Sequence, residues 1–529
     1  MRYDESKMTG RPQYVTLTLK NAVVEERSEG LFSSKSQIDL LRLLTVIGAA
    51  TRSPRVQLLI LVIREVNIGW AQIEEIHAEL DKFHRAGKKS ISFLQQADNR
   101  LYYLGCGTQE IYLAPSGGID LIGLRAEIFF FKNALDYLGV EPEIFSLGQY
   151  KSAAEIFNRE RMSEASRAMS LSILSDIQER VTHKVAEARK VAPEQVREWI
   201  DSGPYTARKA RERGLVDGLL YEDQMEEVVT RKLPGANELP ARKLAPEEGR
   251  FKRAITFRRP RIAYIVAEGM IMAGESRRAR GHRPVLGADS LIEALNAARK
   301  NERIKAVVLR LNSPGGSAVA SDLIWRAVKL TGEKKPVIIS LGNVAASGGY
   351  YIAVAGQRIV AMPATLTGSI GVIAGKFNVQ RLFGRLGITV DSVQTGARSG
   401  YQSITRPFTE SEQEVVREQM REFYEELFLK KVAEGRERSI EQIREVAEGR
   451  VWTGHQALQN GLIDEWGGLR RAFELARQLA GLEDRKIRVV PLVRKRRWLD
   501  LLPFPLFETP PLEPSQGPLF LMAEDWQIW

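Results

Sequence analysis

The stretches "LYYLGCGTQEIYLAP" (101–115) and "GYYIAVAGQRIVAMP" (349–363) decide the fold, because they are two versions of one segment. A shift of 248 positions lays the first on the second and pairs Tyr102 with Tyr350. The same shift lays "VQLLILVI" (56–63) on "IKAVVLRL" (304–311). One shift that holds over so much of the chain indicates an internal duplication.

Each half alternates short apolar runs with longer amphipathic stretches. In the second half, the pattern predicts a strand over 304–311, a helix over 320–330, a strand over 336–341 and a helix that starts at Ser347. A charged helical region then follows in each half, at 163–190 and 410–435. Alternating strands and helices of this kind predict an α/β fold with parallel strands.

The chain of 529 residues is too long for one hydrophobic core, so we expect several domains. We predict an N-terminal half over 1–231, a linker over 232–250, a C-terminal half over 251–490 and a tail over 491–529. The linker expectation rests on the polar sequence "KLPGANELPARKLAPEEGR" (232–250). The tail is rich in proline and aromatic residues, which suits an extended docking segment better than a spanning helix.

The composition excludes several classes of protein. The net charge is +11, but the basic residues lie in separate clusters with no stacking aromatics among them, so we expect no nucleic-acid partner. The single cysteine, Cys106, excludes an internal disulfide framework. No secretory signal peptide and no membrane-spanning segment are expected, since the apolar stretch 38–50 is interrupted by Asp39 and Arg42.

The two halves differ in their loops in a complementary way. After the strand at 304–311 the second half has "NSPGGS" (312–317), where the first half has "REVNIG" (64–69). Ser347, in "GNVAASGGYY" (342–351), corresponds to Asn99. Conversely, Lys151 in "LGQYKSAAE" (147–155) corresponds to Ser399. One half therefore keeps a candidate nucleophile and a glycine turn, and the other keeps a candidate base.

A serine nucleophile needs a base within hydrogen-bond reach and donors for the oxyanion. The five histidines lie outside these loops, and no H-x-x-x-H or C-x-x-C spacing occurs, so a Ser/His/Asp triad and a zinc site are disfavoured. Lysine can replace histidine when it is neutral, which requires a dry pocket. The backbone N–H groups of Gly316 and Gly348 are the candidates for the oxyanion hole.

These residues resemble the signal peptide peptidase A family of serine proteases, in the Clp-protease/crotonase superfamily. The matching stretches are "LRLNSPGGS", "GNVAASGGYYIA", "TGSIGV" and "YKSA", and they are similar to the long, duplicated bacterial form. The resemblance implies two tandem Clp-protease/crotonase-like domains, a Ser/Lys dyad of Ser347 and Lys151, and no cofactor or metal. It also implies that Ser369 holds the lysine by a hydrogen bond and that Gly316 contributes to the oxyanion hole.

Further expectations follow from the same resemblance. The family forms ring- or bowl-shaped oligomers, which implies a homotetramer here, and it degrades signal peptides and other unfolded apolar segments. Family members are membrane-associated through an N-terminal anchor; because none is visible, a cytoplasmic or peripheral location is also open. The tail lies outside the resemblance, and its aromatic residues suit either docking on a subunit or contact with a membrane surface. The aromatics considered for such contacts are Trp498, Phe504, Trp526 and Trp529.

Other interpretations of the same residues remain open at this point. Ser347 could serve as a helix N-cap, Lys151 as a solvated loop residue and Ser369 as a turn former, and the tyrosine pair at 350–351 is expected to pack in the core. The alternatives for the whole chain are a crotonase-like acyl-CoA enzyme and a non-catalytic chamber that binds apolar peptides.

Overall fold

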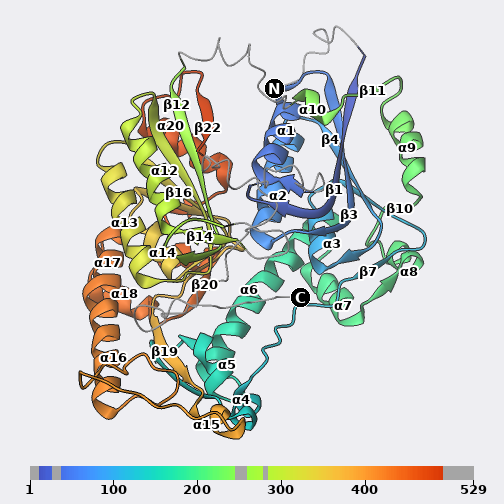
Figure 1. Ribbon diagram of the computed structural model, residues 1–529. Helices are drawn as coiled ribbons and strands as arrows, with labels where there is room; N and C mark the ends of the chain where they lie inside the picture. Colours follow the sequence, from blue (N-terminus) through green and yellow to red (C-terminus); the bar gives the residue numbers. More distant parts are fainter. Residues whose placement is uncertain (1–10, 27–36, 245–258, 278–283, 493–529) are drawn as a thin grey trace, which may run out of the picture. The chain divides into compact units, whose positions relative to one another are not determined.

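The computed structural model describes residues 11–26, 37–244, 259–277 and 284–492 of the chain (Figure 1). The predicted tail, with its aromatic residues, lies outside these ranges apart from Pro491 and Leu492. No helix within the described ranges has both the length and the apolar character needed to cross a membrane.

The chain forms two compact units that interleave along the sequence. Unit 1 consists of 1–125 and 175–258, and unit 2 consists of 126–174 and 259–529. The sequence had suggested two consecutive halves, but the segment 126–174, which carries Lys151, clusters with the second unit. The long helix α6 (Glu164–Arg189) contains the point where the chain passes back from unit 2 to unit 1.

Unit 1 is built on a sheet whose strands run in the order β10-β6-β4-β3-β1-β11 and are all parallel. Their bounds are β1 Gln13–Val24, β3 Val56–Asn67, β4 Lys89–Leu94, β6 Glu110–Leu113, β10 Gly218–Leu219 and β11 Asn237–Glu238; β2 Gln37–Asp39 also pairs with β1. A smaller sheet joins β5 Ala97–Asp98, β7 Gly118–Asp120 and β9 Tyr205–Thr206. The helices are α1 Leu40–Arg52, α2 Trp70–Arg85, α3 Asn99–Gly105, α7 Pro193–Ser202, α8 Ala207–Glu212, α9 Met225–Lys232 and α10 Ala241–Leu244. The first part of the expected linker therefore forms β11 and α10.

Unit 2 has a similar sheet with the order β20-β18-β16-β15-β12-β22, in which β20 is antiparallel to β18 and the other neighbours are parallel. Strand β17 joins β16 to β21. The bounds are β12 Arg261–Glu268, β15 Ile304–Ser313, β16 Val337–Ala346, β17 Arg358–Ala361, β18 Leu366–Gly368, β20 Val451–Thr453, β21 Glu465–Trp466 and β22 Arg488–Pro491. The short strands β13 Met270–Met272 and β14 Val285–Gly287 pair with each other. Strand β16 runs five residues beyond the predicted end at 341, so it leads directly into Ser347.

The helices of unit 2 cover its sheet and extend beyond it. Helices α12 (Ala288–Lys300) and α13 (Ala318–Gly332) lie together beside the sheet (Figure 1). The others are α14 Gly348–Ala353, α15 Gln380–Arg385, α16 Glu410–Glu422, α17 Lys430–Arg436, α18 Ile440–Val446, α19 Gly454–Gln459 and α20 Leu469–Leu479. The expected helix over 410–435 is thus interrupted, because residues Phe423–Leu429 form a π-helix between α16 and α17.

The duplication extends to individual polar contacts. In unit 1 the Tyr102 hydroxyl donates to the carbonyl oxygen of Leu215 over 2.7 Å, and in unit 2 the Tyr350 hydroxyl donates to that of Leu462 over 2.8 Å. The ion pair between Arg189 and Asp217 recurs between Arg436 and Asp464. Such matched interactions support a common origin of the two units.

Strand β8 (Glu141–Leu147) is the part of the early segment that joins unit 2. It pairs antiparallel with β19 (Val372–Asn378), in a register that sets Leu147 opposite Val372. Around it lie α4 Lys132–Leu138, the 3-10 turn Ser152–Ala154 and α5 Glu155–Asn158. This pairing brings the loop that follows β8 to the turn between β18 and β19, where Ser369 lies.

Candidate active site

Ser347 occupies a strained turn between β16 and α14. Its backbone has φ 56° and ψ −115°, a region that residues with a Cβ rarely adopt and that costs about 1–3 kcal/mol. Its N–H donates to the carbonyl oxygen of Gly368 over 2.8 Å. Although Ser347 precedes a helix, its side chain makes no capping hydrogen bond. The hydroxyl group therefore points to a partner other than the helix.

That partner is the amine of Lys151, which lies in the same chain and the same compact unit. Nζ of Lys151 is 3.1 Å from Oγ of Ser347, and it also lies 2.7 Å from Oγ and 3.0 Å from the carbonyl oxygen of Ser369. The exposed fractions of the three residues are 4%, 1% and 3% for Lys151, Ser347 and Ser369. The structure thus brings together the three residues that the family resemblance implies should meet.

The loop that carries Lys151 is fixed by its backbone. The N–H of Lys151 donates to the carbonyl oxygen of Gly148, and that of Tyr150 donates to the carbonyl oxygen of Glu448 over 2.7 Å. Gly449 faces the lysine so closely that a Cβ there would lie 2.6 Å from Cβ of Lys151. Glu448 and Gly449 were not singled out from the sequence, since nothing in "AEGRVW" distinguishes them from an ordinary turn.

The glycine turn after β15 lies beside the serine. Gly316 has φ 148°, and a Cβ on it would lie 2.1 Å from the carbonyl oxygen of Ile271, so no other residue fits. A Cβ on Gly348 would lie 3.3 Å from the amide nitrogen of Gly316. The amides of Gly316 and Gly348 are therefore close neighbours next to Ser347. Ile271, which was not predicted, holds the turn, because its N–H donates to Gly315 and its carbonyl accepts from Ser317.

A pocket opens next to these groups and contains about 270 Å³ of empty space, its mouth included. Its lining combines small residues from the two loops with apolar side chains: Gly316, Ala318, Ser321, Gly348, Tyr351, Gly371, Val372, Ile373, Phe423 and Phe428. Tyr350 packs in the core as predicted, with 0% exposure. Tyr351 is also buried, but it contributes to the pocket wall, which the sequence analysis did not foresee.

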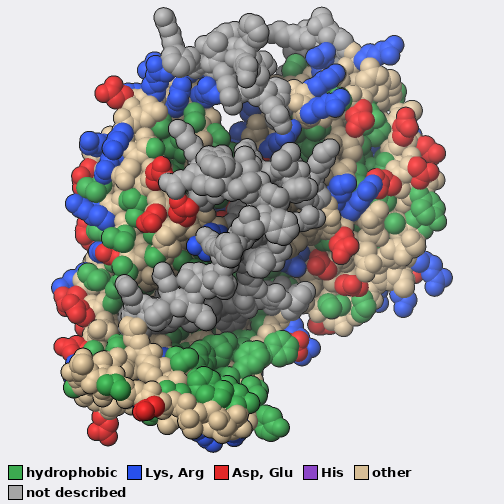
Figure 2. Space-filling view, in the orientation of Figure 1, with side chains coloured by type: hydrophobic (Ala, Val, Ile, Leu, Met, Phe, Trp, Pro, Cys, Tyr) green, Lys and Arg blue, Asp and Glu red, His purple; other side chains and the backbone are tan. Residues whose placement is uncertain are grey.

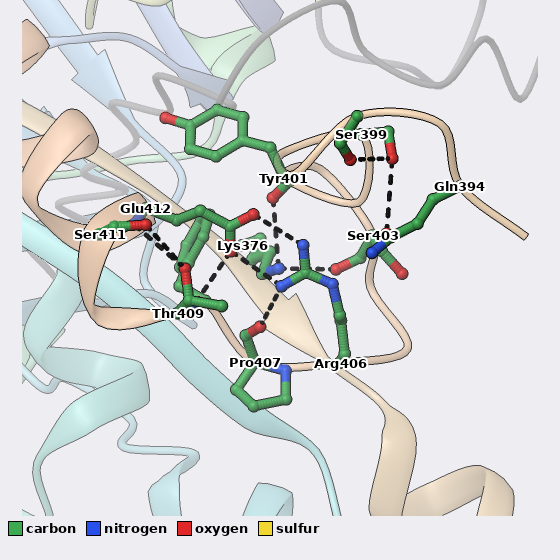
Figure 3. Close-up of polar contacts among 12 residues, drawn as sticks. Lys376, Gln394, Ser399, Tyr401, Ser403, Arg406, Pro407, Thr409, Ser411 and Glu412 are labelled. Atoms are coloured by element: carbon green, nitrogen blue, oxygen red, sulfur yellow. Dashed lines mark hydrogen bonds and ion pairs between the residues drawn. The ribbon is translucent and has the colours of Figure 1, made fainter. Parts of the chain in front are cut away.

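The counterparts of the site residues in the other copy of the repeat serve structural roles. Asn99 of unit 1 is buried and bridges backbone groups: its Nδ2 donates to Gly123 over 2.9 Å and its Oδ1 accepts from Ile122 over 3.1 Å. Ser399 is exposed and donates to the carbonyl oxygen of Gly396 within its own loop (Figure 3). Among the described residues, no three His, Cys, Asp or Glu side chains converge on a possible metal position.

Comparison with known proteins matches this arrangement to a family of proteases. The model of peptidase family S49 matches residues 82–233 and again 329–483, and the Clp protease model matches 285–367. The chain belongs to peptidase family S49. The two S49 matches fall on the two copies of the repeat, and the Clp protease match confirms the Clp-like α/β fold predicted for the second copy.

Curated relatives of this S49 peptidase are proteases by name, and one of them is named a serine protease. It is 32% identical to "Serine protease SPPA, chloroplastic" of Arabidopsis thaliana over 91% of this chain and 71% of the relative. It is 33% identical to "Protease 4" of Salmonella typhi over 76% of this chain and 66% of the relative. The corresponding values for "Protease 4" of Haemophilus influenzae are 32%, 77% and 67%. The chain is therefore a serine peptidase that acts on peptides or proteins.

Proposed function

We propose that this S49 peptidase cleaves peptide bonds with a dyad of Ser347 and Lys151. With its amine neutral, Lys151 accepts the hydroxyl proton of Ser347 across the 3.1 Å between Nζ and Oγ. Oγ then attacks the carbonyl carbon of the substrate, and the amides of Gly316 and Gly348 donate hydrogen bonds to the oxyanion. Lys151 passes its proton to the leaving amine, which yields the acyl-enzyme. The same lysine then deprotonates the water that releases the acyl group.

The observation that carries this proposal is the short contact between two buried side chains 196 positions apart in the sequence. A lysine that served only for solubility would extend into water, whereas Lys151 is 4% exposed. We propose that Ser369 is a positioning residue, because its hydroxyl and carbonyl oxygens both accept from Nζ and leave the amine aimed at Ser347.

We further propose that the substrates are apolar peptide segments, such as cleaved signal peptides and unfolded chains. The pocket beside Ser347 supports this, because its side chains are mainly aliphatic or aromatic and would disfavour a charged residue. An extended substrate would place one side chain there and its scissile carbonyl against the two glycine amides.

Substitution of the dyad tests the proposal. Ser347→Ala should remove hydrolysis of an apolar fluorogenic peptide, and Lys151→Ala should lower kcat by about 10²–10⁴-fold. Lys132→Ala is a matched control, since Lys132 lies on the same segment but is partly exposed and pairs with Asp136. The rate should rise with pH as the lysine loses its proton. Full turnover by Lys151→Ala would contradict the proposal.

For the assembly we propose a homotetramer, with peripheral contact to a membrane as a further possibility to be tested. Hydrophobic side chains gather on the surface near α4 and α15 (Figure 2), and those exposed there include Phe129, Tyr137, Leu138, Leu386 and Ile388. Surfaces of this kind mark interaction sites. Sedimentation analysis of the whole chain should give the mass of four copies, and cosedimentation with anionic vesicles tests membrane contact.

A further inference from the structure

The lining of the pocket beside Ser347 includes a cluster of three aromatic rings, Tyr351, Phe423 and Phe428. The ring of Tyr351 stacks on that of Phe423, with centroids 5.6 Å apart and planes 17° apart, and it meets the ring of Phe428 at 4.9 Å. Tyr351 and Phe428 are each 1% exposed. Rings in such mutual contact have few alternative rotamers, so this part of the wall is bulky and fixed.

The π-helix explains how two phenylalanines of one helical segment reach the same pocket. Phe423 and Phe428 are the first and sixth residues of the π-helix Phe423–Leu429. In an α-helix, residues five apart point in directions about 140° apart, because each residue turns by about 100°. A π turn closes its hydrogen bond over five residues, which brings positions five apart onto nearly the same side. π turns are often found at functional sites.

A partly exposed ion pair contacts the aromatic cluster. The Tyr351 hydroxyl donates to Oδ1 of Asp322 over 2.7 Å, and Asp322 also pairs with the Lys431 ammonium. Nζ of Lys431 lies 3.9 Å above the Trp325 ring and 5.1 Å from that of Tyr351. Since Lys431 follows the π-helix by two residues, this pair ties the π-helix to α13 and to the tyrosine.

We infer that Tyr351, Phe423 and Phe428 determine specificity by limiting the depth of the pocket, and that Asp322 and Lys431 are positioning residues for them. The pocket would accept a small or aliphatic side chain, such as alanine or leucine, on the residue before the scissile bond and would reject an aromatic one. The space that the lining residues enclose is small, so it disfavours a bulky aromatic side chain. The inference rests on the proposed function, since Ser347 must be the nucleophile for this pocket to receive that side chain.

A series of fluorogenic peptides that differ only in the residue before the scissile bond tests the inference. The wild-type enzyme should show a higher kcat/KM for alanine and leucine than for phenylalanine. Phe423→Leu and Phe428→Leu should each raise the ratio of kcat/KM for the phenylalanine peptide to that for the leucine peptide by about tenfold. A purely structural defect would lower both values together and leave this ratio unchanged.

The positioning residues are tested with the same ratio. Lys431→Met keeps the length and apolar stem of the side chain but removes the charge that binds Asp322, so we expect the ratio to rise. Lys431→Arg should restore the wild-type preference. The matched control is Lys430→Met, because Lys430 is the neighbouring lysine, is half exposed and pairs with Glu426 instead. This control should keep the wild-type ratio.

Two results would overturn the inference while the proposed function stands. One is a wild-type enzyme that prefers phenylalanine in the peptide series, which requires no variant to fold. The other is an unchanged ratio in Phe423→Leu and Phe428→Leu, measured in folded protein that still cleaves the leucine peptide. By contrast, a wild-type enzyme whose Ser347 forms no adduct with a fluorophosphonate would overturn the proposed function itself.

Discussion

Nζ of Lys151 lies 3.1 Å from Oγ of Ser347, although the two residues belong to different copies of an internal repeat. The contact forms within one chain because β8 leaves the first copy and pairs with β19 of the second. Duplication gave the protein two equivalent sets of loops, and each copy retains part of what the proposed reaction needs. The first copy supplies the lysine, and the second supplies the serine and the glycine turn.

The close packing of Gly449 on Lys151 predicts a sensitive position outside the dyad. Gly449→Ala would place a Cβ 2.6 Å from the lysine and force it to move, so we expect kcat to fall by about 10²-fold. The control is Gly387→Ala: both glycines have positive φ, 77° and 71°, but Gly387 has open space around its Cβ position. Both variants lose about 1 kcal/mol of stability through backbone strain, and only the first should lose activity in steady-state kinetics.

Ser369 provides a second test of how the lysine is held. Ser369→Ala removes the oxygen 2.7 Å from Nζ but leaves the carbonyl oxygen at 3.0 Å. The lysine would be aimed less well, so kcat should fall about ten- to hundredfold with little change in KM. The control is Ser399→Ala, at the exposed serine that corresponds to Lys151 in the repeat, and it should match the wild type. Equal kcat values in the two variants would contradict a role for Ser369 in positioning Lys151.

Substitutions in the repeated ion pair test whether stability and catalytic activity can be changed independently. Asp464 accepts from Arg436 and from the Ile359 N–H, and Asp217 accepts from Arg189 and the Ile111 N–H. Asp217→Asn and Asp464→Asn should each lower the free energy of unfolding by about 1–3 kcal/mol, measured with a chemical denaturant. Asp217 lies in unit 1, which contains neither Ser347 nor Lys151, so Asp217→Asn should keep the wild-type kcat. A folded Asp217→Asn protein without activity would contradict this division.

The start of α16 predicts a pH dependence of stability. Arg406 binds both carboxylate oxygens of Glu412, and the Thr409 N–H donates to the same carboxylate (Figure 3). The pKa of Glu412 is lowered from 4.5 to about 2, and the hydrogen bonds from Arg406 are the main cause. The pKa of Glu412 is lower in the folded protein than in the unfolded chain. Its ionised carboxylate therefore stabilises the fold at pH values above the unfolded-state pKa, and this stabilisation is lost as the pH falls from about 4.5 towards 2.

Thermal unfolding at a series of pH values measures this contribution. Glu412→Gln should have a lower Tm than the wild type at neutral pH, and the difference should shrink as the pH falls through this range. Glu410→Gln, at an exposed position of the same first turn, should show no such convergence. A constant difference in Tm between Glu412→Gln and the wild type at all pH values would contradict the prediction.

The sequence predicted the parts of the fold that depend on local pattern and on the repeat. Comparison of one half with the other predicted the strands and the helices that follow them. The same comparison singled out Ser347 as a candidate nucleophile and Lys151 as a candidate base. The sequence did not predict that residues 126–174 belong to unit 2. This placement depends on the long-range pairing of β8 with β19, which local sequence pattern does not encode. The π-helix Phe423–Leu429 was likewise hidden within one predicted helix, because the charged pattern of 410–435 gives no sign of a change in helix type.

The central claim is that Ser347 is the nucleophile and that Lys151 activates it. The most direct test is mass spectrometry of the protein after reaction with a fluorophosphonate probe, compared among the wild type, Ser347→Ala and Lys151→Ala. The account predicts one adduct on the peptide that contains Ser347, none in Ser347→Ala and much slower formation in Lys151→Ala. An adduct on another serine, or peptide hydrolysis that persists in Ser347→Ala, would contradict it.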